Sequence, residues 1–227
     1  NGIFNLLIDP RSKVQAAAIP MRDKRQFAGH CRRLGLPTAE ILAVVSEGRW
    51  TTLDARPGAF DRDLFVKPVK SKGAIGAVAY KFLESNAYLD SDGMMLTRED
   101  LETWLARLSL NKPMMVLQKL RNHPEIADLA VESAITFRVF TCFDAEDVPV
   151  VTHGMLRILS KLEPEWGIDD EFGAPIDLDS GRLGLMCSDL DLAPQSWWHL
   201  HPQTSAPVEG RIIANWPAIA ELARLAH

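Results

Sequence analysis

The strongest constraint on the fold is a pair of neighbouring stretches with the two-residue period of β-strands. Within residues 134–143, one set of side chains alternates with a second: Ile135, Phe137, Val139 and Thr141 with Thr136, Arg138, Phe140 and Cys142. A polar turn at residues 144–147 leads into a second β-prone stretch at residues 148–159. The two stretches therefore predict an antiparallel hairpin, with the charge of Arg138 in mid-strand needing a partner or a ligand.

The predicted helices lie in segments of the sequence separate from the predicted strands. Thr97 can cap a helix with a buried stripe spaced i, i+3, i+4 and i+7: Leu101, Trp104, Leu105 and Leu108. Further helices are predicted over residues 21–34 and 215–225, and further strands over residues 41–45 and 114–120. Residues 86–93 are polar and typical of a turn. Because strands and helices do not alternate regularly, the pattern indicates an α+β fold.

Composition excludes several classes of protein. The formal net charge is -5, and the chain contains neither a basic tail nor a basic block, so we expect no nucleic-acid partner. No apolar run approaches the roughly 18 residues of a membrane span, and no signal peptide is visible, so we expect no membrane insertion. The three cysteines (Cys31, Cys142 and Cys187) are widely spaced and are typical of reduced thiols in a cytoplasmic protein.

Residues 63–82 form the stretch with the clearest chemical potential. Two short strands, at residues 64–66 and 77–82, flank a loop that holds lysines, Ser71 and two glycines, Gly73 and Gly76. Glycine lets backbone N–H groups approach a polyphosphate closely, and ammonium groups can stand beside it. The alternative interpretation is an ordinary hairpin with solvated lysines, since Gly-x-x-Gly is a weak signal.

Metal-binding patterns are weaker. The acidic run from Asp169 to Glu171 can supply oxygen ligands for Mg²⁺, or it can be a solvated loop. His199 and His201 would share one face of a strand, where they could bind a metal or serve in the core or at the surface. The P-loop, the dinucleotide-binding glycine motif, the hydrolase Gly-x-Ser-x-Gly and the His-Glu-x-x-His pattern are all absent.

The order of the remaining parts favours phosphate binding. Lys24 on a predicted helix precedes Lys67 on a predicted strand, the glycine loop follows, and a second strand ends at Gln118. Arg138 on the strongest strand comes last. These are groups that a nucleoside triphosphate needs, and they supply a reason for an arginine in mid-strand.

With these residues the chain resembles the ATP-grasp superfamily, most closely the sugar-transfer-associated ATP-grasp family. The resemblance runs from about residue 21 to the C-terminus. It is carried in the first half by Asp23-Lys24, Gly35-Leu36-Pro37-Thr38, Leu64-Phe65-Val66-Lys67-Pro68, Gly73 and Gly76. In the second half it is carried by Leu117-Gln118-Lys119-Leu120, His123-Pro124, Thr136-Phe137-Arg138-Val139-Phe140-Thr141, Ala174-Pro175-Ile176-Asp177, Ser180-Gly181, His201-Pro202, Thr204 and Gly210.

The resemblance implies an ATP-grasp-like α+β fold in which two α+β subdomains enclose a nucleotide cleft. It implies a small or lid subdomain at residues 21–116 and a large subdomain at residues 117–227, after an N-terminal segment of unassigned role at residues 1–20. The bound molecules implied are ATP and Mg²⁺. The metal ligands themselves are left unassigned.

The resemblance also implies a role for each matching residue. Lys24 and Lys67 would contact the phosphates, with Gly73 and Gly76 in a loop that closes over them. Gln118 would read the adenine amino group, and Lys119 and Leu120 would supply backbone contacts. Glu125, with His123 as a rival, would bind the ribose, and Arg138 would be the catalytic residue at the terminal phosphate.

The implied function is a carboxylate–amine or carboxylate–nucleophile ligase that works through an acyl-phosphate, linked to sugar transfer or polysaccharide biosynthesis. The chain departs from such ligases after Arg138, where the expected aspartate and Glu-x-Asn motif are missing; Glu84-Ser85-Asn86 occurs too early and is read as chance. Two expectations follow. Either the metal-binding strands lie beyond His227, which the absence of an initiator methionine favours, or the protein is an inactive nucleotide-binding or interaction module.

Overall fold

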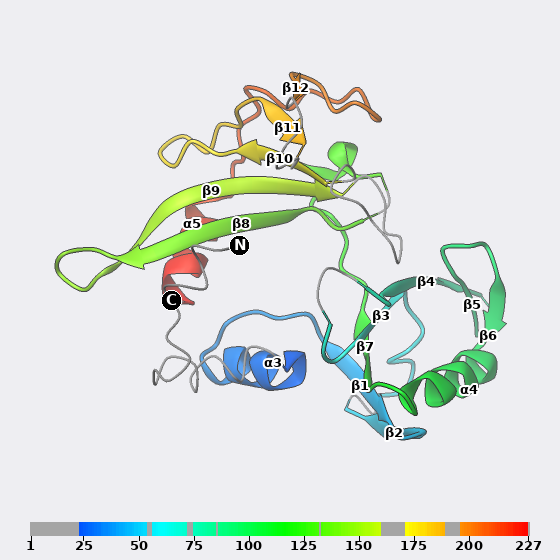
Figure 1. Ribbon diagram of the computed structural model, residues 1–227. Helices are drawn as coiled ribbons and strands as arrows, with labels where there is room; N and C mark the ends of the chain where they lie inside the picture. Colours follow the sequence, from blue (N-terminus) through cyan, green and yellow to red (C-terminus); the bar gives the residue numbers. More distant parts are fainter. Residues whose placement is uncertain are drawn as a thin grey trace. The chain divides into compact units, whose positions relative to one another are not determined.

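The computed structural model describes residues 23–53, 56–71, 75–84, 86–131, 133–159, 171–188 and 196–226 (Figure 1). The chain divides into two compact units, Asn1–Lys119 and Leu120–His227. Each unit contains an antiparallel sheet with helices, which confirms the α+β fold class. In the described part of the chain, no helix has the length and apolar character needed to cross a membrane.

The first unit is built on a seven-stranded sheet in the order β2-β1-β7-β3-β4-β5-β6. Its elements, in chain order, are α3 (Lys24–Arg33), β1 (Ile41–Ser46), β2 (Arg49–Thr52), β3 (Leu64–Pro68), β4 (Val78–Leu83), β5 (Ala87–Leu89), β6 (Met95–Thr97), α4 (Arg98–Ser109) and β7 (Met114–Gln118). The predicted hairpin of residues 63–82 is confirmed as β3 and β4, with Leu64 opposite Tyr80. The expected turn at residues 86–93 is wrong in part, because β5 pairs with both β4 and β6.

Alternation along the strands gives this sheet two different apolar faces. One face carries Leu64, Val66 and Val116, and packs with Leu101 and Leu105 of α4. The opposite face carries a smaller buried cluster to which α3 contributes: Ala28, Ile41, Val44, Val69, Met115 and Leu117, with Phe65 packed against it. The second face is the one that positions the candidate site.

The two described helices of the first unit, α3 and α4, begin where the sequence provides a cap. Thr97 caps α4, accepting from the Asp100 N–H at 3.1 Å while the Asp100 carboxylate accepts from the Thr97 N–H at 3.0 Å. Asp23 caps α3, accepting from the backbone N–H groups of Arg25 at 3.0 Å and Gln26 at 3.4 Å. The start of α3 at Lys24 is therefore fixed locally.

The second unit holds a five-stranded sheet in the order β12-β11-β10-β9-β8. Its elements are the 3₁₀ helix η1 (Ala127–Leu129), β8 (Thr136–Phe143), β9 (Pro149–Leu159), β10 (Glu171–Pro175), β11 (Met186–Ser188), β12 (Trp197–Trp198) and α5 (Trp216–Leu225). The predicted hairpin is confirmed as β8 and β9, the long arm seen in Figure 1. Its core includes Leu156, Ile158, Phe172, Ala174 and the fully enclosed Trp216.

Two expectations for this unit are wrong. Glu171 lies in a strand and not in an acidic loop, because β10 is sandwiched between β9 and β11 and turns Phe172 and Ala174 into the core. His199 and His201 do not share a strand face, because β12 ends at Trp198. Residues 169 and 170 lie outside the described residues.

Candidate functional site

Lys24 is held over the chain segment that follows β3. Its Nζ donates to the carbonyl and the hydroxyl of Ser71, each at 3.0 Å. It also lies 3.3 Å from the Pro68 carbonyl and 3.4 Å from the Val69 carbonyl. One ammonium group thus ties the start of α3 to the beginning of the predicted glycine loop.

Lys67 lies beside it on the α3 face of the sheet. The alternation of β3 buries Leu64 and Val66 on the α4 face, so Phe65 and Lys67 point to the other face. The Lys67 ammonium lies 5.8 Å from the centroid of the Phe65 ring, within reach of a cation–π interaction.

The pKa values of both lysines are lowered in the folded protein. Burial lowers the pKa of Lys67, and the positive charge of Lys24 lowers it further. Burial also lowers the pKa of Lys24, against a smaller opposing effect of Asp23. Among the described residues, no carboxylate forms an ion pair with either ammonium group. The lysine pair (Lys24 and Lys67) therefore carries partly desolvated positive charge that no described carboxylate compensates, a charge state that an anion could match.

Gly76 stands at the far end of the loop, before β4. Its φ is +74°, in the left-handed region that favours glycine. A Cβ there would lie 2.9 Å from the ammonium of Lys112 and 3.3 Å from Cγ of Pro68. Lys112 thus adds a cation beside Gly76, and no sequence pattern singles this lysine out. Gly73 falls outside the described residues, so its predicted role stays a prediction.

Gln118 ends β7, in register with Leu64 of β3. Alternation puts its exposed side chain on the α4 face, whereas Leu117 and Lys67 are on the α3 face. The backbone N–H of Gln118 donates to the Glu40 carbonyl at 3.1 Å, and that of Lys119 donates to the Asp63 carbonyl at 2.9 Å. The structure therefore brings Lys24 and Lys67 together, sets Gly76 beside Lys112 and Pro68, and does not place the Gln118 side chain on the face of the two lysines.

Arg138 belongs to a charged cluster on the sheet of the second unit. Glu171 of β10 is 3% exposed and accepts from both Nε and the terminal nitrogen of Arg157 in β9. Arg138 of β8 reaches the same carboxylate at 3.3 Å and keeps half of its side chain exposed. From the sequence, Arg157 has no predicted role and Glu171 is considered only as a metal ligand, since only strand pairing brings the two residues beside Arg138.

The described residues do not fit a magnesium site. Glu171, the one member of the predicted acidic run that is described, has its carboxylate engaged by two arginines. Within the described ranges, no group of three or more histidine, cysteine, aspartate or glutamate residues lies close enough to hold a metal ion. No described residue is therefore assigned as a metal ligand.

The other predicted residues have structural partners. The Glu125 carboxylate accepts from the backbone N–H of Ala214 at 2.6 Å, and His123 lies 3.9 Å from it. His199 contacts Glu209 at 2.5 Å. His201 is buried against the Phe172 ring, which lowers its pKa, and its Nδ1 faces the N–H of Thr204 at 3.1 Å.

Comparison with known proteins identifies the family of the chain. The model of the family described as sugar-transfer associated ATP-grasp matches residues 5–227, nearly the whole chain. Neither the curated proteins nor the solved structures gave a match. The chain therefore belongs to the sugar-transfer associated ATP-grasp family.

Proposed function

We propose that this protein binds ATP and uses it to activate a carboxylate for ligation, the reaction class that its family membership supports. The observation that carries the proposal is the lysine pair. Lys24 and Lys67 bring two partly desolvated ammonium groups together at the end of β3, beside a loop that needs a glycine at Gly76. A triphosphate supplies the negative charge that this site lacks.

The first unit also offers surroundings suited to a nucleoside. The partly buried ring of Phe65 packs against the buried cluster on the α3 face of the sheet and offers an apolar group next to Lys67. In the described part of the chain, no hydrogen bond involves the carbonyl of Lys119 or the backbone N–H of Leu120. We propose that these two backbone groups bind the edge of the adenine, and that Gln118 at the end of β7 assists them. Glu125 of the second unit remains the candidate for the ribose hydroxyls.

Arg138 is the proposed catalytic residue. In the reaction, an oxygen of the substrate carboxylate attacks the γ-phosphorus, the bond to the β-phosphate oxygen breaks, and ADP leaves. An amine or other nucleophile then displaces phosphate from the acyl-phosphate. The exposed half of the Arg138 side chain can neutralise the phosphoryl oxygens. Glu171, which also binds Arg157, holds the Arg138 guanidinium in place.

Trapping the acyl-phosphate tests this function. The purified protein is incubated with ATP, a set of carboxylic acids that includes sugar acids, and hydroxylamine as nucleophile. We expect ADP and a hydroxamate in equal amounts, both lost in Arg138→Ala. Failure to form hydroxamate with any carboxylate, in a protein that binds ATP, would reject the ligase proposal.

A second candidate is a nucleotide-binding module without catalysis. The observation that favours it concerns Glu171 in the sheet of the second unit, because the charge of this carboxylate is already matched by Arg138 and Arg157. In this case ATP binds with an affinity that depends on Lys67, and no ADP forms under any of the conditions above. Any ADP formation that depends on Arg138 would reject this candidate.

A further inference from the structure

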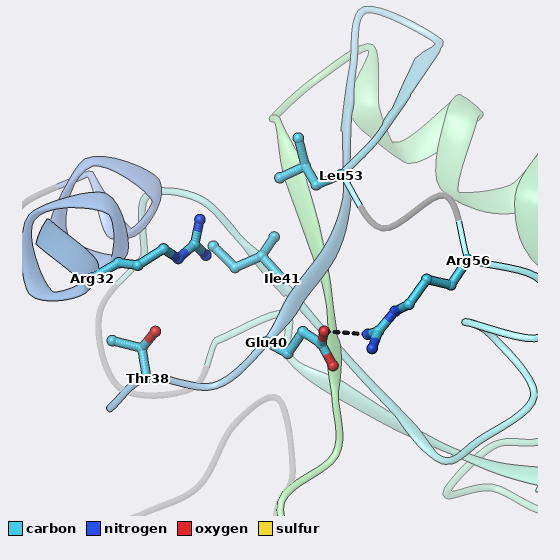
Figure 2. Close-up of a pocket in the computed structure, with 6 residues that line it drawn as sticks. All are labelled: Arg32, Thr38, Glu40, Ile41, Leu53 and Arg56. Atoms are coloured by element: carbon cyan, nitrogen blue, oxygen red, sulfur yellow. Dashed lines mark hydrogen bonds and ion pairs between the residues drawn. The ribbon is translucent and has the colours of Figure 1, made fainter. Parts of the chain in front are cut away.

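A groove that the proposed ATP chemistry does not use runs along α3. It consists of two adjoining cavities of about 410 and 320 Å³, which share Arg32, Ile41 and Leu53 as lining residues. Figure 2 shows the first, with Arg32 and Thr38 on one side, Arg56 on the other, and Ile41 and Glu40 between them. We call this feature the α3 groove. Its volume is in the range of sites that hold small organic ligands.

The groove lies beside a different stripe of α3 from the one that carries Lys24. Arg25, Gly29 and Arg32 are spaced i, i+4 and i+7 and line the groove. Lys24 precedes this stripe by one residue, a step of about 100° around the helix axis. One helix thus serves two separate cationic sites, and a ligand in the α3 groove does not occupy the lysine pair.

The charges that line the groove leave it net positive among the described residues. Arg25 is matched by Asp23 at 2.9 Å. Glu40 is shared between Arg56 at 2.5 Å and Arg62 at 3.5 Å. No described carboxylate lies within ion-pair distance of Arg32, which stands where the two cavities meet. An anionic group would therefore be drawn to Arg32.

The remaining lining is that of a site for a hydroxylated ring. Ile41, Val44 and Leu53 supply an apolar surface for C–H groups. Further polar groups can exchange hydrogen bonds with hydroxyls along the edge of the groove: Thr38, Glu40, Ser46, Thr51 and Arg56. Apolar faces with a hydroxylated edge are the chemistry of a sugar.

We propose that the α3 groove binds an anionic sugar, with its phosphate or carboxylate on Arg32 and its hydroxyls directed toward Glu40 and Thr38. The inference rests on the lining of the groove and on no step of the proposed ATP reaction. It assigns a ligand class to a part of the first unit that lies outside the lysine pair.

Titration calorimetry at low salt with glucose 1-phosphate, glucuronate and glucose tests this proposal. We expect one of the two anionic sugars to bind and uncharged glucose to bind at least 10-fold more weakly, since a charge-assisted hydrogen bond contributes about 1.5–3 kcal/mol. The anionic sugar that binds more tightly distinguishes a phosphate ligand from a carboxylate ligand. Equal binding of all three sugars, or binding of none at millimolar concentration, would overturn the proposal.

Arg32→Ala and Arg33→Ala form a matched pair of variants. Both arginines are exposed and lie at the end of α3, but Arg33 contacts His30 and lines neither cavity. We expect Arg32→Ala to weaken the anionic sugar about 10-fold or more and Arg33→Ala to change it less than about 2-fold. Equal losses in the two variants would show general charge attraction and reject the site. ATP affinity should stay unchanged in Arg32→Ala, so this outcome is independent of the lysine pair.

Discussion

At the scale of single residues, Lys67 is a charge that the described structure of the first unit compensates poorly. Its ammonium is partly desolvated, lies near a second ammonium and has no described carboxylate as partner. Such an arrangement opposes folding, because the protein alone does not compensate it. Binding sites commonly hold groups of this kind, whose charge is satisfied only by the ligand.

The first prediction concerns the stability effect of Lys67. Its pKa in the folded protein is below the ordinary value of 10.5, so the unfolded chain binds the proton more tightly. The penalty is present at neutral pH and is relieved as the pH rises from the lowered pKa toward 10.5. Lys67→Met, which keeps the apolar stem, should therefore raise the melting temperature at pH 7. Lys81→Met, at an exposed lysine of β4, is the control and should leave it nearly unchanged.

The second prediction concerns Glu171. Its removal breaks the ion pair with Arg157, whose side chain is 14% exposed. Glu171→Ala should lower the free energy of unfolding by about 3 kcal/mol or more, as expected for a broken buried ion pair. Glu221→Ala removes an exposed partner of Arg224 and should cost less than about 1 kcal/mol. Chemical denaturation measures both, and equal small losses would show that Glu171 does not anchor the arginine cluster.

At the scale of elements, α3 is positioned by Asp23. This buried carboxylate caps the helix and pairs with Arg25, and these interactions lower its pKa to about 2 against a smaller opposing effect of burial. Because Lys24 is the first residue of the helix, fraying of this end would also move one member of the lysine pair. The cap thus links helix stability to the candidate site.

The third prediction separates the two roles of Asp23. Asp23→Ala should destabilise the protein by about 1 kcal/mol through loss of the cap, whereas Asp23→Asn keeps a capping side chain and should lose less. The advantage of the wild type over Asp23→Asn is present above the ordinary pKa of 3.8 and is lost as the pH falls through about 2. Thermal unfolding at pH 7 and in acid checks this, and an advantage that does not change in acid would contradict it.

The sequence predicted those elements whose local pattern is strong. The hairpin of β8 and β9 follows its alternation, and α4 begins at its capping box. The strand β10 was missed because Glu171, Gly173 and Pro175 have little β preference. It forms through long-range packing, and a Cβ at Gly173 would lie 2.5 Å from Cε of Met155.

In the candidate site, too, local sequence patterns predicted some residues, and long-range contacts determined the others. Lys24 and Lys67 could be selected from their order along the chain, whereas Lys112 and the pairing of Glu171 with two arginines could not. Their neighbours are set by strand pairing and by loop closure between residues distant in sequence. No periodicity within a short window reports such contacts.

At the scale of the whole molecule, the chain consists of two units that each bring a cluster of cations. The first holds the lysine pair and the α3 groove, and the second holds Arg138 and Arg157 around Glu171. Membership of the sugar-transfer associated ATP-grasp family supports ATP as the ligand that we propose for the lysine pair. It leaves the acceptor open, and the α3 groove offers a separate place to look for sugar recognition.

The most direct test of the central claim is a calorimetric titration of ATP and AMP into the wild type, Lys67→Met and Lys81→Met. We predict that Lys67→Met weakens ATP about 10-fold or more, because a charge-assisted contact to a terminal phosphate is lost, and that Lys81→Met does not. The affinity for AMP should be nearly the same in all three proteins. Unchanged ATP affinity in Lys67→Met, or an equal loss for ATP and AMP, would contradict a triphosphate site at the lysine pair.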